Sequence, residues 1–217
     1  MGSIKVIPKE LGKFITFEGG EGAGKSTQIK LLSKFLKTEG LTTVLTREPG
    51  GSSGGEDIRR LLVTGAIDRW DPMAETLLHM AARRSHLVGL IEPALQEGKW
   101  VLCDRFADST EAYQGYGQGL NLGFISELRR NILGEIEPEL TFLLDISVDE
   151  GLTRATARGN IARYEQMDRS IHEKIRLGFL KIASENKRRI VVIDASQSIT
   201  AIEAEIRQKT VQRFGLN

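Results

Sequence analysis

One short stretch restricts the fold of this chain more than any other: Gly19-Gly20-Glu21-Gly22-Ala23-Gly24-Lys25-Ser26. It fits the pattern G-x-x-x-x-G-K-[ST], in which glycines let the backbone turn so that successive N–H groups face phosphate oxygens. Lys25 would add a positive charge at these oxygens, and Ser26 would offer its hydroxyl to Mg²⁺. A helix that begins near Gly24 would direct the positive end of its dipole at them. The stretch therefore predicts a phosphate-binding loop.

The residues on both sides of this loop follow the order that such a loop requires. Residues 13–17 are typical of a strand, and residues 26–37 place Ile29, Leu32 and Phe35 on one helical face. By average residue usage, the pattern alone would arise by chance in roughly one or two of a hundred chains of this length. The order of strand, loop and helix makes a chance match rarer still.

Five short apolar runs predict strands, and they are nearly continuous, as is typical of strands buried on both faces of a parallel sheet. These runs are Phe14–Phe17, Thr43–Leu45, Trp100–Cys103, Leu140–Leu144 and Ile190–Ile193. Helical patterns lie at about 25–38, 56–63, 74–97, 122–133, 149–158, 168–186 and 199–213. This alternation predicts an α/β P-loop NTPase fold, with helices on both faces of a doubly wound five-stranded parallel sheet. No repeat or linker divides residues 1–217, so we expect a single domain.

The composition limits the partners and the compartment. The 217 residues suffice for one sizeable α/β domain, and a net charge of +1 gives no reason to expect a nucleic-acid partner. The single cysteine, Cys103, excludes an intrachain disulfide and lies in an apolar run, as a small core residue would. No apolar run approaches the roughly 18 residues of a membrane span, and residues 1–11 lack a signal-peptide core. We therefore expect a cytoplasmic protein without a membrane partner.

Charged residues lie at the end of each predicted strand, namely Glu18, Arg47-Glu48, Asp104-Arg105, Asp145 and Asp194. In open α/β sheets, ligands bind outside the carboxyl ends of the strands. These positions are therefore expected to converge on the edge that carries the phosphate-binding loop. Asp145 and Asp194 are equally typical of helix caps and turns.

The loop alone does not identify a reaction, because motor proteins, GTPases, AAA-type ATPases and small-molecule kinases share it. The chain has no Asn-Lys-x-Asp element of a guanine-specific GTPase, and no acidic pair follows the strand that ends at Cys103. Arginines occur instead after the strands, at Arg47, Arg59, Arg83, Arg105 and Arg163. The planar guanidinium suits phosphate and the charge that develops in phosphoryl transfer. Together they favour a nucleoside-monophosphate kinase, whose second substrate is itself a phosphate.

Four segments give the chain a close resemblance to the bacterial thymidylate kinase family, and the resemblance extends from about residue 14 to residue 194. They are F-E-G-G-E-G-A-G-K-S-T at 17–27, T-R-E-P-G-G at 46–51, D-R-F-A-D-S-T at 104–110 and A-Y-Q-G at 112–115. Their combination is highly specific to that family. The resemblance implies that the γ-phosphoryl group of ATP is transferred to dTMP, with Mg²⁺ as cofactor, in a homodimer.

The resemblance also implies roles for individual residues. The ATP site would comprise Gly19, Gly20, Glu21, Gly22, Ala23, Gly24, Lys25, Ser26 and Thr27. The catalytic group would comprise Lys25, Arg105, Asp104, Glu21, Arg163 and Arg158, with Ser26 and Asp104 at the Mg²⁺. The dTMP site would comprise Arg47, Glu48, Arg59, His79, Arg83, Arg105, Thr110, Tyr113 and Gln114. Within that site, Arg83, Thr110 and Gln114 match positions that read the thymine edge, and an amide such as Gln114 can both donate and accept.

A lid is predicted at about residues 158–166, which are rich in charge and poor in apolar residues. Some members of the family carry an arginine in the phosphate-binding loop, where this chain has Gly22, and the bacterial type supplies it from the lid instead. Arg163 is our first candidate for that arginine and Arg158 the second. Closure of a lid would bring positive charge to the transferred group and exclude water.

Three positions depart from the family pattern. His79 stands where a phenylalanine that stacks on thymine is expected, and it could take a charge at lower pH. Gln118 stands where an arginine is common, and Ala162 where an aspartate is common. Two other functions stay open: a kinase for another monophosphate or a nucleoside, and a nucleotide-dependent switch that binds ATP without transferring its phosphate.

Overall fold

The computed structural model describes residues 11–157, 159 and 163–216. Within these residues the sheet has five strands in the order β2-β3-β1-β4-β5, and every neighbouring pair is parallel. The strands are β1 (Phe14–Glu18), β2 (Thr43–Arg47), β3 (Trp100–Asp104), β4 (Leu140–Asp145) and β5 (Ile190–Asp194). The predicted doubly wound α/β fold is confirmed, and each predicted strand lies within an observed one.

The helices between the strands follow the predicted order, with differences at their ends. The α-helices are α1 (Lys25–Thr38), α2 (Ser53–Val63), α3 (Pro72–His86), α4 (Glu92–Gln96), α5 (Ala107–Thr110), α6 (Leu122–Leu133), α7 (Val148–Thr156), α8 (Arg169–Glu185) and α9 (Ile199–Phe214). Short 3-10 turns form η1 (Ile67–Arg69) and η4 (Arg163–Gln166), and π-helical turns form η2 (Leu87–Ile91) and η3 (Glu111–Gly117). The predicted helix 74–97 is therefore a succession of α3, η2 and α4, and sequence patterns did not predict α5 and η3.

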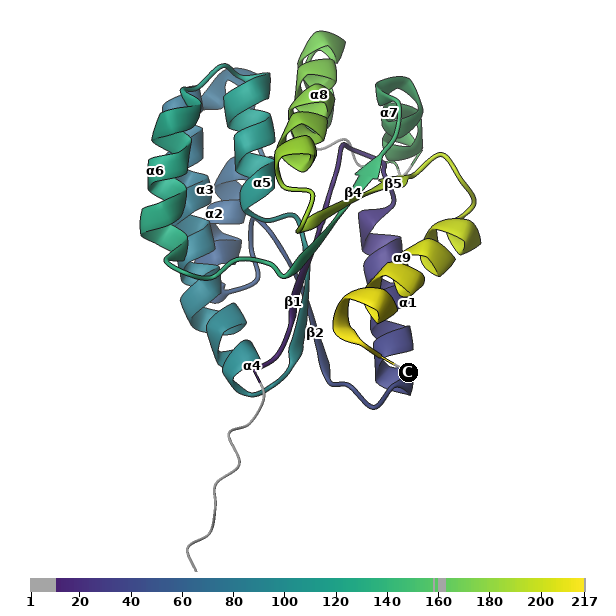
Figure 1. Cartoon of the computed structure of the whole chain (residues 1–217). Coiled ribbons are helices and arrows are strands. Elements are labelled where there is room, and N and C mark those ends of the chain that lie inside the picture. Colours follow the sequence, from purple (N-terminus) through teal and green to yellow (C-terminus); the bar gives the residue numbers. More distant parts are fainter. Residues whose placement is uncertain (1–10, 158, 160–162, 217) are drawn as a thin grey trace, which may run out of the picture.

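Helices cover both faces of the sheet (Figure 1). On one face, Ile15 and Phe17 of β1 pack with Leu36 of α1 and Ile206 of α9. On the other face, Phe14 packs with the segment from η2 to α6. Two hydrophobic layers thus enclose β1, which explains its continuous apolar sequence.

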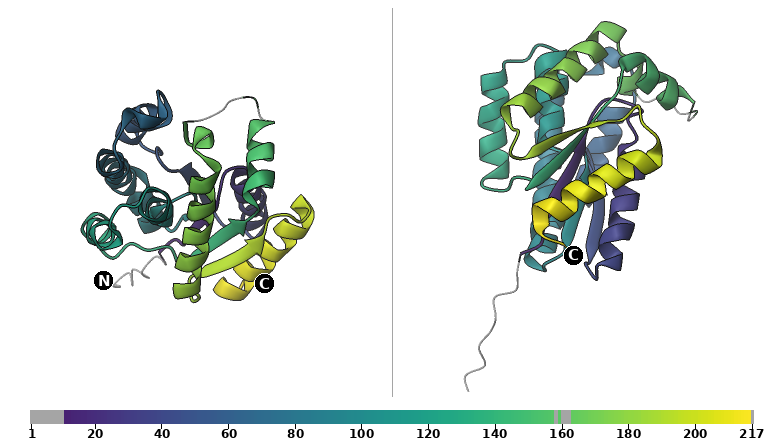
Figure 2. Two further views of the ribbon diagram at one scale, coloured as in Figure 1. Left: turned by 90° about the horizontal axis from the view of Figure 1, so that it is seen from above. Right: turned by 45° about the vertical axis from the view of Figure 1, so that its right-hand side comes forward.

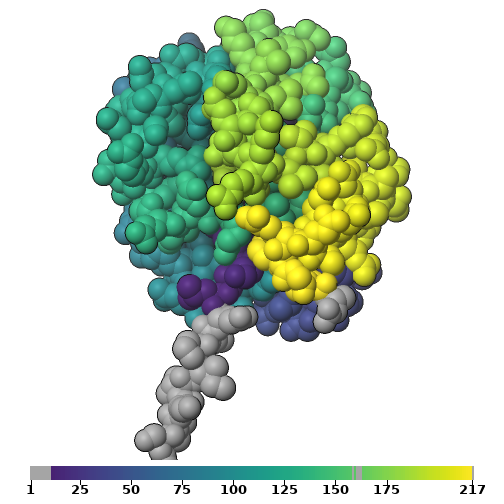
Figure 3. Space-filling model, in the orientation of Figure 1, coloured from purple at the N-terminus to yellow at the C-terminus, as the bar shows by residue number. Residues whose placement is uncertain are grey.

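The helix α8 packs on η3, and the two share a third apolar cluster with β4 (Figure 2). In the space-filling view, α8 and α9 lie along the front of the molecule (Figure 3). Among the described residues, no helix combines the length and the apolar character needed to cross a membrane.

The register of the strands brings their charged ends together. Asp104 at the end of β3 lies level with Phe17 of β1 and with Arg47 of β2. Cys103, one residue earlier, is fully buried, and burial raises the pKa of its thiol well above the usual value. Cys103 is a core residue, as expected, whereas the next two residues, Asp104 and Arg105, are only partly buried.

Candidate functional site

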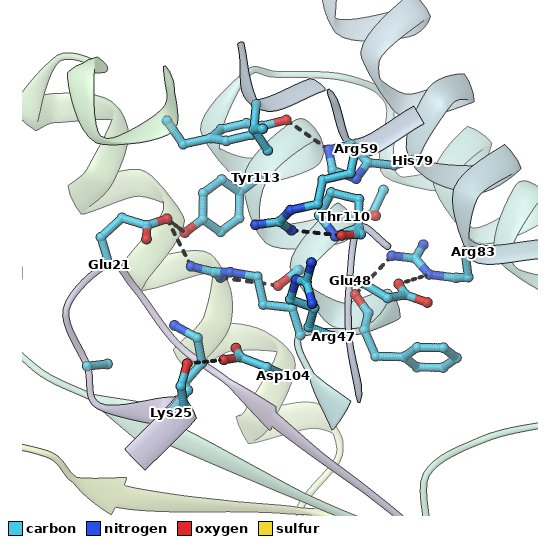
Figure 4. A pocket seen from close by; sticks show the side chains of 18 of the residues that line it. Glu21, Lys25, Arg47, Glu48, Arg59, His79, Arg83, Asp104, Thr110 and Tyr113 are labelled. Carbon is cyan, nitrogen blue, oxygen red and sulfur yellow. Dashed lines mark hydrogen bonds and ion pairs between the residues drawn. The ribbon is translucent and has the colours of Figure 1, made fainter. Parts of the chain in front are cut away.

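A cavity of about 280 Å³ lies at the carboxyl ends of β1, β2 and β3. The predicted site residues that line it are Glu21, Gly22, Ala23, Gly24, Lys25, Ser26, Thr27, Arg47, Glu48, Arg59, His79, Arg83, Asp104, Arg105, Thr110, Tyr113 and Gln114. Figure 4 shows their side chains converging from several elements. The cavity has the size and the mixed polar lining of a small-molecule site.

The phosphate-binding loop joins β1 to α1, and two of its glycines are required by close packing. Gly22 has φ 67°, and a Cβ there would lie 2.0 Å from the carbonyl oxygen of Gly151 in α7. Gly19 has φ 134°, and a Cβ there would lie 2.4 Å from the carbonyl oxygen of Leu144. No side chain fits at position 22, so an arginine cannot come from this point of the loop.

Lys25 is held inside the curve of the loop. Its Nζ donates to the carbonyl oxygens of Gly19 and Gly20 at 3.1 and 2.8 Å. Burial, together with the nearby Arg105, lowers the pKa of Lys25 to about 8. An anion in the loop would therefore stabilise the protonated amine.

Ser26 at the start of α1 meets Asp104 at the end of β3, and these are the two residues that the family resemblance assigned to Mg²⁺. The Ser26 hydroxyl donates to Asp104 Oδ2 at 2.6 Å. Hydroxyl and carboxylate oxygens fit Mg²⁺, which takes few protein ligands and completes its shell with phosphate oxygens and water. Among the described residues, no group of three or more His, Cys, Asp or Glu side chains could hold a metal by itself. A magnesium ion at this pair would thus depend on a bound nucleotide.

Arg105 lines the cavity and is fixed by its neighbours. Its guanidinium donates to the Gly19 carbonyl at 2.9 Å and to Glu21 Oε1 at 2.9 Å. The Tyr113 hydroxyl donates to the same Glu21 oxygen at 2.8 Å, and the Tyr113 ring lies 4.9 Å from the guanidinium. Burial would raise the pKa of Glu21, but Arg105 and Lys25 outweigh it and lower the pKa to about 2. Glu21 is therefore a carboxylate that balances two cations.

The backbone of Arg105 is left-handed, with φ 66°, which is costly for a residue with a Cβ. The adjacent loop is held by Glu18, which accepts from the Phe106 N–H at 2.7 Å and from the Ser109 hydroxyl at 2.6 Å. Burial, with the nearby Asp108, raises the pKa of Glu18 to about 7. The sequence marked Glu18 as a charged strand end but did not predict this function.

Two further arginines, Arg47 and Arg59, face the cavity (Figure 4). Arg47 pairs with Glu56 at 3.0 Å and is half exposed, and Arg59 donates to the Pro49 carbonyl at 2.7 Å. Burial and the proximity of Arg47 lower the pKa of Arg59. Such crowding of like charges is favourable only beside an anion, which fits a bound phosphate.

At the far end of the cavity lie the residues predicted to read a base. Thr110 Oγ1 is buried and has no hydrogen-bond partner in the described protein, so it is available to a ligand. Arg83 is 2% exposed and donates to Glu48 Oε2 at 2.7 Å and to the Phe106 carbonyl at 3.0 Å. His86 occupies the other oxygen of Glu48 at 3.1 Å. Glu48 lines the cavity but is engaged mainly in holding Arg83.

His79 lies opposite Tyr164, a residue that was not predicted to be part of the site. The two are joined by a hydrogen bond of 2.8 Å between His79 Nε2 and the Tyr164 hydroxyl. Burial, with Arg83 and other nearby arginines, lowers the pKa of His79 to about 3. The charged form that the sequence left open is therefore disfavoured near neutral pH, and His79 presents a neutral ring.

The structure does not bring Arg163 to the cavity, which corrects its predicted position. Its side chain is 2% exposed and donates to the carbonyls of Leu62, Ala66 and Ile67 at 3.2, 3.0 and 2.7 Å. It also pairs with Glu75 Oε2 at 2.6 Å. These partners hold each of the three guanidinium nitrogens of Arg163 away from the cavity, whereas the next residue, Tyr164, lines it. The second candidate, Arg158, lies outside the described residues.

Comparisons with known proteins agree with this geometry. Residues 17–206 match the family model described as thymidylate kinase. The chain is 52% identical over 205 residues to a thymidylate kinase of Caulobacter vibrioides, covering 94% of this chain and 99% of that one. It is 49% identical over 206 residues to a thymidylate kinase of Afipia carboxidovorans, covering 94% and 90%. The crystal structure of an Ehrlichia chaffeensis thymidylate kinase is similar, with a TM-score of 0.75 at 36% identity, covering 92% and 98%.

Proposed function

Since the chain belongs to the thymidylate kinase family, we propose that it transfers the γ-phosphoryl group of ATP to dTMP and releases ADP and dTDP. One observation carries the proposal. One cavity is lined by the phosphate-binding loop, by Arg47, Arg59 and Arg105, and by Thr110, whose hydroxyl has no hydrogen-bond partner among the described residues. It offers cationic groups for the phosphates of a donor and an acceptor, and a hydroxyl for a base.

The transfer proceeds by direct in-line attack of a dTMP phosphate oxygen on the γ-phosphorus. The attacking phosphate is already ionised, so no side-chain base is required. The protein instead holds two mutually repelling polyanions together and neutralises the charge between them. Lys25 neutralises the donor phosphates, and Arg105 lies where it can contact both substrates. Glu21 keeps Arg105 in place.

Ser26 and Asp104 would hold the Mg²⁺, which supplies further positive charge to the donor phosphates when bound. We also propose a homodimer in the cytoplasm. Exposed apolar side chains on α3 and η2, namely Met73, Leu77 and Val88, support an interface there. Sedimentation of the purified chain tests the dimer, and a monomer at micromolar concentration would contradict it.

The deciding experiment measures ADP release from Mg-ATP with dTMP, dUMP, dCMP, dGMP, AMP and thymidine as acceptors. A fast rate that is selective for dTMP supports the proposal. Preference for another acceptor would keep the kinase and refute the thymine pocket. Tight ATP binding with no transfer to any acceptor would favour a nucleotide-dependent switch.

A further inference from the structure

Glu75 of α3 is a fully buried carboxylate beside the base end of the cavity. Oε1 accepts from Gln114 Nε2 at 2.8 Å and from Gln118 Nε2 at 2.9 Å. Oε2 lies 2.6 Å from a guanidinium nitrogen of Arg163 as an ion pair, but it accepts no hydrogen bond within the described structure. Burying a carboxylate is costly unless it is paired in this way. Two segments remote in sequence, residues 114–118 and Arg163, thus converge on one side chain that does not itself line the cavity.

The chemistry of this contact determines which way the Gln114 amide faces. A carboxylate can only accept hydrogen bonds, so the NH₂ group of Gln114 has to face Glu75. The amide is planar, and its oxygen lies on the other side of the group from the hydrogen bond. Because Gln114 lines the cavity, the group that it can offer to a ligand there is this carbonyl oxygen.

The Gln118 side chain provides independent evidence that Glu75 determines the orientation of neighbouring amides. Gln118 Nε2 faces Glu75, while Gln118 Oε1 is buried without a hydrogen-bond partner in the described structure. An unmet buried acceptor is unfavourable. The Gln118 amide nevertheless keeps this orientation, because the reverse orientation would place the Gln118 carbonyl oxygen against the negatively charged oxygen of Glu75.

We propose that Glu75 is a positioning residue that sets base selectivity through Gln114. This inference rests on the proposed function. With its carbonyl turned to the cavity, Gln114 accepts from a base that carries a ring N–H, as thymine and uracil do. Cytosine presents an unprotonated ring nitrogen at the same place, where two lone pairs would repel. Glu75 therefore favours imide bases without touching them.

The test compares dTMP with dCMP as acceptors for the wild type, Glu75→Gln and Gln118→Ala. A glutamine at 75 can donate as well as accept, so the Gln114 amide is free to turn over. We expect the ratio of kcat/KM for dTMP over dCMP to fall by about tenfold or more in Glu75→Gln. Gln118→Ala also removes a Glu75 contact but leaves Gln114 paired, so its ratio should stay at the wild-type value. Adding Gln114→Ala should abolish the effect of Glu75→Gln on the ratio.

An equal loss for both acceptors in Glu75→Gln, with an unchanged ratio, would overturn the proposal and leave Glu75 a structural residue. A wild type without preference for dTMP would instead refute the proposed function first. A second measurement needs no variant at Glu75 and so does not depend on its folding. In the ¹⁵N-labelled wild type, the Gln114 side-chain amide protons, assigned by their loss in Gln114→Ala, should exchange slowly with solvent before any nucleotide binds. Fast exchange would contradict the contact.

Discussion

Replacing Arg105 by glycine and by alanine separates the two roles of this residue, its charge and its backbone. Both variants lose the guanidinium that we propose to contact both substrates. Arginines that stabilise phosphoryl transfer contribute about 10³-fold or more to turnover. We therefore expect kcat to fall by at least about 10³-fold in each variant.

The backbone effect distinguishes the two variants. Arg105 has φ 66°, and such a conformation costs a residue with a Cβ roughly 1–2 kcal/mol. Glycine avoids this cost but loses about 0.5–1 kcal/mol more in conformational freedom on folding. The glycine variant should thus be more stable than the alanine variant by about 0.5–1 kcal/mol. For a chain of this length that corresponds to a Tm about 1–4 °C higher.

Thermal unfolding followed by circular dichroism and ADP release under saturating substrates provide the two measurements. Because both variants lose the same contacts to Glu21 and Gly19, that loss cancels in the comparison. An alanine variant that melts at or above the glycine variant would refute the backbone argument. A folded variant with turnover within tenfold of the wild type would refute the role of the charge.

Three further predictions concern neighbouring residues. Lys25→Ala should lower turnover by several orders of magnitude with little change in Tm, since among the described residues the lysine donates only to loop carbonyls. Near-normal ADP release by the folded variant would disprove this. The pKa of Glu18, about 7, lies above its usual 4.5, so the folded state binds the extra proton and stability falls as pH rises through that interval. In Glu18→Gln, the fall in Tm between pH 5 and 8 should be smaller than in the wild type. An unchanged dependence of Tm on pH would argue against this role of Glu18. The pKa of His79 is about 3, so the wild type and His79→Phe should show the same pH profile of KM for dTMP between pH 5.5 and 8. An inflection that is present in the wild type and absent from the variant would contradict this.

Sequence patterns could predict the sheet and the donor half of the site because both depend on short, local signals. A strand buried on both faces reads as an apolar run, and its carboxyl end is followed by the residues of the site. The register that sets Asp104 level with Arg47 then follows from a parallel sheet. In contrast, α5 and η3 form from residues 107–117, which carry little apolar periodicity, and they pack through contacts with α8. Such contacts are not visible in a local pattern.

The partner of a buried charge was the hardest feature to predict. Arg163 lies in a charged segment, which is typical both of a lid that contacts phosphate and of a solvated loop. Its observed partners are a carboxylate on α3 and carbonyl groups in the last turn of α2 and just after it, none of them near Arg163 in sequence. A charged pattern shows where cations gather, but the nearest buried anion decides where each of them points.

The polarity of α3 contains a signal that would have identified Glu75. Glu75, Arg83 and His86 recur at helical spacing and would ordinarily be assigned to the solvent face. In the structure they are 0%, 2% and 0% exposed, whereas Met73 and Leu77 on the other side are 39% and 48% exposed. The interior face of the helix thus carries charged residues beside the apolar Met80 and Ala82, while two large apolar residues lie toward the surface. An interior can accept such a face only where polar groups meet it, here Gln114 and the buried carboxylate Glu48. A charged stripe opposite an apolar one, on a helix close to a phosphate-binding loop, therefore indicates a face that lies against the ligand site rather than against water.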